Sequence, residues 1–153
     1  MKVDFWLLSR DPAERVVAMI AERVLAGGER ALVVSGEPAQ RDAIGQALWD
    51  AKPEAFLANG EAGGEHDARQ PILISEGCRA ANSASACILA DGQWRPEALG
   101  GGTLDGAVFE RVFLLFDDAG RDAARAAWRE VSARDGLERS FYEQKDGRWA
   151  KIA

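Results

Sequence analysis

The chain has 153 residues, of which 47% are hydrophobic and 29% are charged, and its net charge at pH 7 is −6. These values are typical of one globular domain that is long enough to bury a hydrophobic core, so we expect a single domain over residues 1–153. The acidic balance argues against a general nucleic-acid-binding surface, because neutralising phosphates requires an excess of Lys and Arg, although a local basic patch can still bind a few anionic groups.

Cysteine and histidine usage and hydropathy exclude several further classes of protein. Cys78 and Cys87 form no CxxC motif and His66 is the sole histidine, so a zinc site is not expected. No apolar run approaches the length of a membrane span, and the start of the chain lacks a signal-peptide pattern. We expect a cytoplasmic protein with two free thiols, no cofactor and no membrane contact.

Strands and helices alternate in the first third of the predicted structure. Residues 3–8 predict a strand, and Asp11-Pro12 predicts a helix start with Asp11 as the N-cap and Gly27-Gly28 as the stop. Residues 31–34 are fully apolar, as in a central parallel strand, and Pro38 opens a helix that runs to Trp49. This order favours a parallel sheet with right-handed crossovers.

The rest of the chain continues the pattern less regularly. Order weakens between residues 54 and 70, where residues 59–66 are a loop by composition, and residues 94–97 and 100–102 form another loop. Further strands are predicted at residues 72–74, 86–89, 112–116 and 140–144. A helix follows the third of these over residues 121–134, with Asp117 or Asp118 as its cap, and Asp146-Gly147 predicts a hairpin turn near the end.

The helix at residues 121–134 has the most informative pattern. Arg121, Arg125 and Arg129 are four residues apart and share one face with Trp128, whereas Ala123, Ala124, Ala127 and Val131 are expected to pack on the sheet. Most charged helical faces are simply solvated. A functional reading of this one is binding, because guanidinium groups pair with carboxylates or phosphates and stack on aromatic rings. The ligand is then an anion with an apolar group attached.

Motifs of catalysis are missing from the sequence. No GxGxxG follows the first strand, no GxxxxGK[ST] occurs, and Ser75 has no GxSxG around it. His66 falls in the least ordered loop, and Cys78 has no identifiable base. An alternative function is a small α/β enzyme of nucleotide or phosphoryl chemistry that uses Asp117, Asp118 and a metal, and a rise in melting temperature with Mg²⁺ or nucleotides would favour it.

Several stretches together resemble the chi subunit of the bacterial DNA polymerase III holoenzyme. Their order and spacing are more specific than any single stretch. They are Phe5–Leu8, Ala47–Trp49, Pro53–Leu57, Gln70–Ile74, Val112–Asp117, Arg125-x-x-Trp128-Arg129 and Tyr142-x-Gln144-x-x-Gly147-x-Trp149.

The resemblance implies a fold and a role. The fold is a three-layer α/β/α sandwich with a mainly parallel, Rossmann-like sheet and no active nucleotide site. The role is that of a non-catalytic accessory of the clamp loader, which binds the acidic C-terminal tail of single-stranded-DNA-binding protein and in some bacteria the psi subunit. A repair helicase is a further possible partner, and neither direct nucleic-acid binding nor a cofactor is implied.

The resemblance also assigns residues. The tail-binding residues resemble Arg121, Arg125, Trp128 and Arg129, with an apolar floor at Leu114 or Leu115. We expect Trp128 to face the ligand, so that its loss changes the melting temperature little. The psi contact corresponds to Trp49, Phe56 and Leu57, for which core packing is the alternative. The sequence departs from the family pattern in its Trp at position 128, where Tyr is commoner, and in Asn59, where His is expected.

We predict that oligonucleotides do not bind at moderate salt, because the arginine face is surrounded by an acidic surface. A gel-shift experiment with single- and double-stranded oligonucleotides measures this directly. A clear shift at moderate salt would contradict the prediction.

Overall fold

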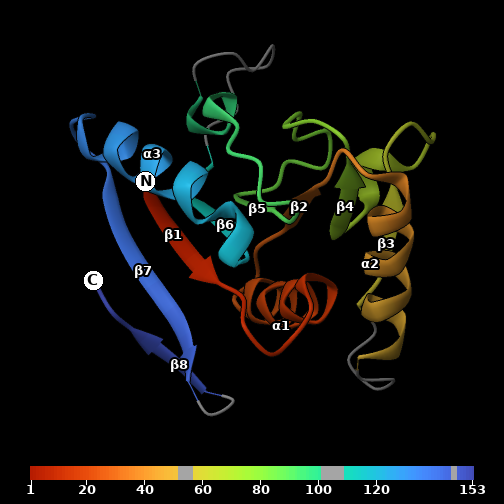
Figure 1. The fold of residues 1–153 in the computed structure, drawn as a ribbon. Helices are drawn as coiled ribbons and strands as arrows, with labels where there is room; N and C mark the ends of the chain where they lie inside the picture. Colours follow the sequence, from red (N-terminus) through yellow and green to blue (C-terminus); the bar gives the residue numbers. More distant parts are fainter. Residues whose placement is uncertain (52–56, 101–108, 146–147) are drawn as a thin grey trace.

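A mainly parallel sheet forms the centre of the protein (Figure 1). The computed structural model of the protein describes residues 1–51, 57–100, 109–145 and 148–153. Eight strands lie in the order β3-β4-β2-β5-β6-β1-β7-β8. They are β1 (Lys2–Leu7), β2 (Ala31–Val34), β3 (Asn59–Glu61), β4 (Ile72–Ser75), β5 (Ala86–Leu89), β6 (Arg111–Phe116), β7 (Glu138–Lys145) and β8 (Arg148–Lys151). All neighbours are parallel except β7 and β8, which pair as an antiparallel hairpin. The predicted α/β class is confirmed.

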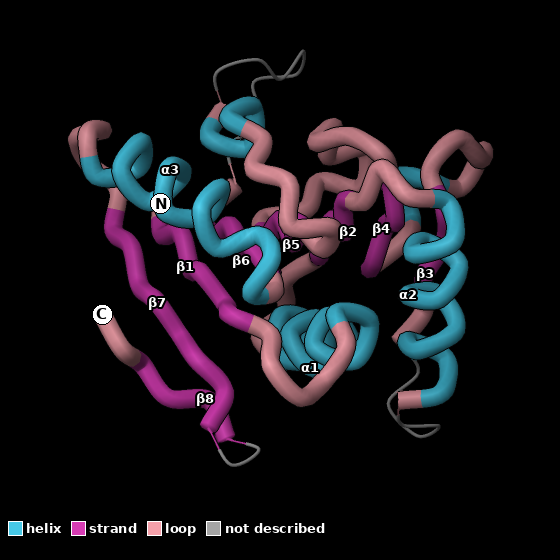
Figure 2. The backbone as a smooth tube through the Cα atoms, viewed as in Figure 1, coloured by secondary structure: helices cyan, strands magenta, loops and turns pink. Residues whose placement is uncertain are grey.

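Three α-helices cover the two faces of the sheet (Figure 2). They are α1 (Ala13–Ala26), α2 (Pro38–Asp50) and α3 (Arg121–Ser132), and the short 3₁₀ helices are η2 (Asp67–Arg69), η3 (Pro96–Leu99) and η4 (Asp118–Gly120). The crossovers through α1 and α2 run in one direction along the sheet, and the crossover from β6 through α3 to β7 runs in the other. Right-handed connections that run in opposite directions lie on opposite faces, which gives the predicted three layers.

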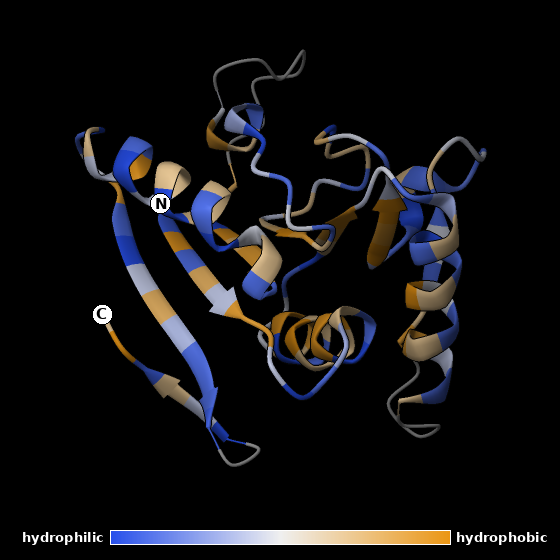
Figure 3. Cartoon of the chain, viewed as in Figure 1, coloured by the Kyte–Doolittle hydropathy of each residue, from blue (hydrophilic) through white to orange (hydrophobic). Residues whose placement is uncertain are grey.

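The core consists of two apolar clusters that the sheet separates. Hydrophobic residues are concentrated on the central strands and on α1 (Figure 3). Strand β6 contributes to both, since side chains alternate along a strand. Leu114 and Phe116 belong to the cluster under α3, whereas Phe113 and Leu115 belong to the cluster under α1 and α2. Every apolar side chain of β6 is therefore buried, which explains its unbroken apolar sequence.

Two predictions for local structure were wrong. Pro12 occupies the N-cap of α1 and no side chain caps that helix; the Asp11 carboxylate instead accepts a hydrogen bond of 2.8 Å from Nε2 of Gln144 on β7. Residues 59–66, predicted to be a loop, begin with the strand β3, which pairs with β4. Its sequence Asn-Gly-Glu has no strand propensity, so pairing with β4 determines its conformation.

The loops that follow β2 and β5 are joined by the carboxylate of Asp91. It forms a bidentate ion pair with Arg95, with both N···O distances 2.8 Å, and accepts the backbone N–H of Gly36 at 2.9 Å. The Asp91 side chain is only 5% exposed. Burial is the largest single influence and raises its pKa, but the hydrogen bonds from Arg95, Gly36 and Gln93 together outweigh burial and hold the pKa of the carboxyl below its usual value.

We predict that Asp91→Asn destabilises the fold by roughly 1.5–3 kcal/mol at pH 7, the range for hydrogen bonds to a charged group. Because the pKa in the folded state is depressed, this stabilisation is fully present above the usual pKa near 3.8 and is lost as the pH falls through the lower folded value. Urea unfolding of both proteins at pH 7 and at pH 3 measures the difference, which should narrow at pH 3. Asp135→Asn, an exposed change, is the control. An equal difference at both pH values would contradict the role of the ionised carboxylate.

Candidate functional site

The turn between β6 and α3 is fixed by two aspartates. Oδ1 of Asp117 accepts the backbone N–H of Gly120 at 3.1 Å and so caps η4, after which α3 begins at Arg121. Asp118 pairs with Arg121 at 2.9 Å. Asp117 or Asp118 was predicted to cap α3, but the N-cap of α3 is Gly120 without a side-chain hydrogen bond, and Asp117 caps η4 instead. Both carboxylates therefore have a structural partner.

Small side chains hold the inner face of α3 close to the sheet. Ala124, Ala127 and Val131 are buried against β1 and β6, as predicted, but Ala123 is exposed. Trp128 takes the remaining place on this face and packs partly into the core, so the helix presents its arginines along the rim. A helix with small inner residues leaves space at its edges that larger residues would have filled.

A pocket of about 270 Å³ occupies that space between α3 and the sheet. Its walls are Phe5 from β1, Phe116 from β6, Phe141 from β7, Ala124 and Trp128 from α3, and Ala153. Arg121 and Arg125 complete the lining. The arrangement is an apolar cavity with two guanidinium groups, which suits an apolar side chain attached to an anion.

Trp128 is both a wall of the pocket and part of the core. Its ring lies edge-on to Phe5 with centroids 5.1 Å apart, and at 6.4 Å from the Phe141 ring. The guanidinium of Arg139 on β7 lies over the indole at 4.2 Å from the ring centroid and donates a 2.9 Å hydrogen bond to the backbone carbonyl of Trp128. Trp128 therefore lines the pocket and also packs onto Phe5, which argues against the expectation that its loss changes the melting temperature little.

The arginines on α3 differ in how firmly they are held. Arg121 pairs with Asp118, and Arg125 lies 3.6 Å from Asp122 while its side chain is 64% exposed. Exposed pairs of this kind contribute little energy, so an anionic ligand can replace either aspartate. Arg129 is exposed one turn further on and lies outside the pocket lining. Within the described residues no acidic side chain pairs with it.

The two leucines predicted as the floor of the site do not line the pocket. Leu114 lies on the correct face but is fully buried beneath the aromatic walls. Leu115 lies on the opposite face, in the cluster under α1 and α2, because alternation along β6 turns it away from α3. The apolar side chains that the sheet contributes to the pocket are those of Phe5, Phe116 and Phe141.

The residues predicted to contact a partner subunit are separated by burial. Trp49 on α2 is 55% exposed, so core packing is not its role. Leu57 is 3% exposed and belongs to the core under α1 and α2. Phe56 lies outside the described residues. Of the three predicted residues, Trp49 is the one that the described structure places on the surface.

Acidic clusters and thiol groups are the features that bear on the alternative, enzymatic function. No group of three or more His, Cys, Asp or Glu side chains in these ranges is close enough to hold a metal ion. Cys78 and Cys87 are free and buried. The hydrogen bond between the two thiols lowers the pKa of Cys78. The same hydrogen bond, together with burial, raises the pKa of Cys87. None of the helices described is long and apolar enough to cross a lipid bilayer.

Comparisons with known proteins place this geometry in context. A family model described as "DNA polymerase III chi subunit, HolC" matches residues 1–138. No curated protein matches the chain. The crystal structure of T4 UvsW is similar at a TM-score of 0.61 and 13% identity over 93% of this chain, which spans 41% of that chain. A second similar structure is the C-terminal domain of an S. cerevisiae Dbp5 variant bound to Gle1 and IP6. The match covers 92% of this chain and 90% of that chain, at 12% identity and a TM-score of 0.49. At this identity the likeness to UvsW shows the fold alone.

We predict that Trp128→Ala lowers the free energy of unfolding by about 2–4 kcal/mol, somewhat below the cost of truncating a fully buried Trp, because the indole is only partly buried. Trp128→Phe, which keeps an aromatic edge against Phe5, should cost less. Urea unfolding measures both, with Arg129→Ala as the exposed control on the same helix. A Trp128→Ala protein within 0.5 kcal/mol of the wild type would show that the indole does not support the fold.

Proposed function

The chain belongs to the DNA polymerase III chi subunit family, and from that premise we propose that it is a non-catalytic accessory subunit that binds the acidic C-terminal tail of single-stranded-DNA-binding protein in the pocket beside α3. Such binding would link the clamp loader to protein-coated single-stranded DNA. The observation that supports this proposal most directly is an apolar pocket with Arg121 and Arg125 in its lining.

The terminal apolar side chain of the tail enters the pocket in this proposal. The walls are aromatic on three sides, from Phe5, Phe116 and Trp128, and a ring inserted among them makes edge and face contacts with each. Phe141 of β7 also lines the pocket. Its volume of about 270 Å³ fits one large side chain and excludes a bulky folded ligand.

The carboxylates of the tail pair with the arginines of α3. Arg121 and Arg125 lie where a carboxylate of a residue seated in the pocket would reach them, and their present partners Asp118 and Asp122 are 86% and 98% exposed. Exchanging these exposed partners for the ligand costs little. Arg129, about 6 Å further along the helix axis, is placed for the acidic residues that precede the end of the tail.

Arg139 has a positioning role in this proposal. It holds Trp128 by stacking on the indole and by its hydrogen bond to the Trp128 carbonyl, so the wall of the pocket is fixed before the ligand arrives. The guanidinium is engaged with Trp128 rather than directed to the ligand. Its loss would loosen the wall and leave the arginines of α3 in place.

Trp49 supports a second contact, which we assign to the psi subunit where one is present, with a repair helicase as the other candidate partner. A large exposed aromatic side chain is a common centre of a protein interface. Trp49 lies on α2, and the tail-binding pocket lies across the sheet from α2, so one chain could bind both partners at once. This arrangement suits a protein that joins two components of a replication complex.

We predict that Arg125→Ala weakens binding of a synthetic tail peptide by roughly 1.5–3 kcal/mol, as expected for loss of a hydrogen bond to a charged group, which is tenfold or more in Kd. Raising the salt concentration should weaken peptide binding by the wild type more than peptide binding by the variant. The reason is that salt screens the Arg125 ion pair, which the variant lacks. Calorimetry at two salt concentrations measures both effects.

Arg69→Ala, an exposed change outside the pocket lining, is the matched control for the change in charge. A peptide without its terminal phenylalanine should not bind measurably to either protein. Equal affinities of wild type and Arg125→Ala for the complete peptide would overturn the assignment of the tail to this pocket.

A further inference from the structure

A second aromatic cluster lies on the opposite face of the sheet, near its β8 edge. Trp6 of β1 is in contact with Tyr142 of β7, with ring centroids 5.1 Å apart, and with Trp149 of β8, at 4.6 Å. Trp6 is buried, but Tyr142 and Trp149 are only half-buried. Together with Met19 of α1 they line a pocket of about 430 Å³, which is within the size range of binding sites.

Arginines supply every charged group that lines this pocket in the described part of the chain. They are Arg23, Arg111 and Arg148. Arg111 is engaged by the buried carboxylate of Asp4 at 2.9 Å and lies over the Phe113 ring. Neither Arg23 nor Arg148 has an acidic side chain within 4.0 Å among the described residues. In the part of the chain that the structure describes, two guanidinium groups without an acidic partner therefore lie beside the half-buried rings of Tyr142 and Trp149.

Strand β8 adds an open edge beside this pocket. It is the last strand of the described sheet and pairs with β7 on its inner side (Figure 1). Residues Ile152 and Ala153 continue this inward pairing through hydrogen bonds with Phe141. The outer edge therefore presents unpaired backbone groups, which is the surface that extended peptides join by strand addition.

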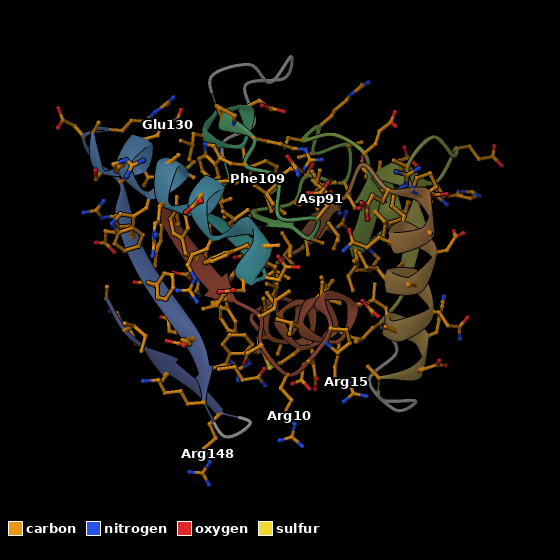
Figure 4. All side chains as sticks on the ribbon, viewed as in Figure 1. Arg10, Arg15, Asp91, Phe109, Glu130 and Arg148 are labelled. Carbon is orange, nitrogen blue, oxygen red and sulfur yellow. The ribbon has the colours of Figure 1, made fainter. Side chains whose placement is uncertain are left out.

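Charge selects what can pair with this edge. Arg148 and Lys151 are both exposed on β8, and Arg148 projects outward at the hairpin (Figure 4). Cations at this edge repel the same edge of a second copy of the chain, so they oppose self-association. They attract a strand that carries carboxylates. The edge thus disfavours pairing with a second copy of the chain and favours pairing with an acidic strand.

We propose that the outer edge of β8, with the pocket formed by Trp6, Tyr142 and Trp149, is a docking site for an extended acidic peptide segment that carries an aromatic side chain. The segment adds as a strand to β8, its ring packs on Trp149 and Tyr142, and its carboxylates pair with Arg23 and Arg148. A nucleic acid is disfavoured, because in the described part of the chain only two guanidinium groups without an acidic partner line the pocket, and the chain as a whole is acidic.

This site is distinct from the pocket beside α3. The two lie on opposite faces of the sheet, and they differ in the group that they require. The pocket beside α3 is proposed to take the free end of a chain, whereas strand addition at β8 needs backbone N–H and C=O groups and no terminal carboxylate. A peptide blocked at both ends therefore separates the two proposals.

The experiment is a titration of ¹⁵N-labelled protein with acetyl-Asp-Asp-Phe-Asp-Asp-amide at low salt, read at the indole N–H signals of the five tryptophans. The signals are assigned with single Trp→Phe variants. We expect the Trp149 and Trp6 signals to shift with one common Kd, and the Trp128 signal to stay in place. Arg23→Ala combined with Arg148→Ala should raise that Kd at least tenfold, and Arg69→Ala should leave it unchanged.

Two further probes test whether the peptide binds by strand addition and whether a nucleic acid binds the site better than the peptide does. The same peptide with N-methyl groups on alternate amides should lose binding at least tenfold, because it can no longer pair with β8. Oligothymidylate should shift the Trp149 signal only at a higher concentration than the peptide. Absence of a Trp149 shift, an unchanged Kd in the double arginine variant, full binding of the N-methylated peptide, or tighter binding of oligothymidylate would each overturn the proposal.

Discussion

The close approach of α3 to the sheet is the constraint on which the candidate site depends. It is possible because the inner face of the helix consists of Ala124, Ala127 and Val131, which let the backbone approach β1 and β6. The same small residues bring Trp128 down onto Phe5 and leave an unfilled volume next to Ala124. A larger residue at position 124 would fill this volume and push the helix outward. The small inner residues of α3 therefore account both for the pocket and for the close packing of the helix on the sheet, and Trp128 contributes to both.

Strand β7 connects the two faces of the protein. Its parallel pairing with β1 brings Arg139 and Phe141 beside Trp128 on one face, and Tyr142 beside Trp6 on the other. Side-chain alternation along this one strand thus contributes to the pocket beside α3 and to the aromatic cluster next to β8. The two surfaces lie back to back across the sheet, a geometry in which ligands on the two faces do not compete for space.

Much of the fold could be predicted from local sequence patterns, because the central strands are unbroken apolar runs and Pro and Gly mark the helix ends. Asp117, Arg121 and Arg125 could be placed for the same reason, since their spacing on a helix is local information. Arg139 could not, because its position over Trp128 depends on the pairing of β7 with β1, which are far apart in sequence. The floor was predicted at Leu114 or Leu115, and Leu115 lies on the other face of the sheet because a shift of one residue along a strand exchanges the two faces. The strand β3 was missed because its residues lack a strand pattern and are ordered by the neighbouring β4.

A double-mutant cycle between Arg125 and the tail peptide tests the central claim most directly. Arg125→Glu is combined with a peptide in which one aspartate is replaced by lysine, and calorimetry gives the four binding free energies. If the peptide lies in the pocket beside α3, the reversed pair recovers part of the lost affinity, and the coupling energy exceeds about 1 kcal/mol for at least one aspartate position. Effects that add within about 0.5 kcal/mol at every aspartate position would contradict the account, because residues that do not meet show no coupling.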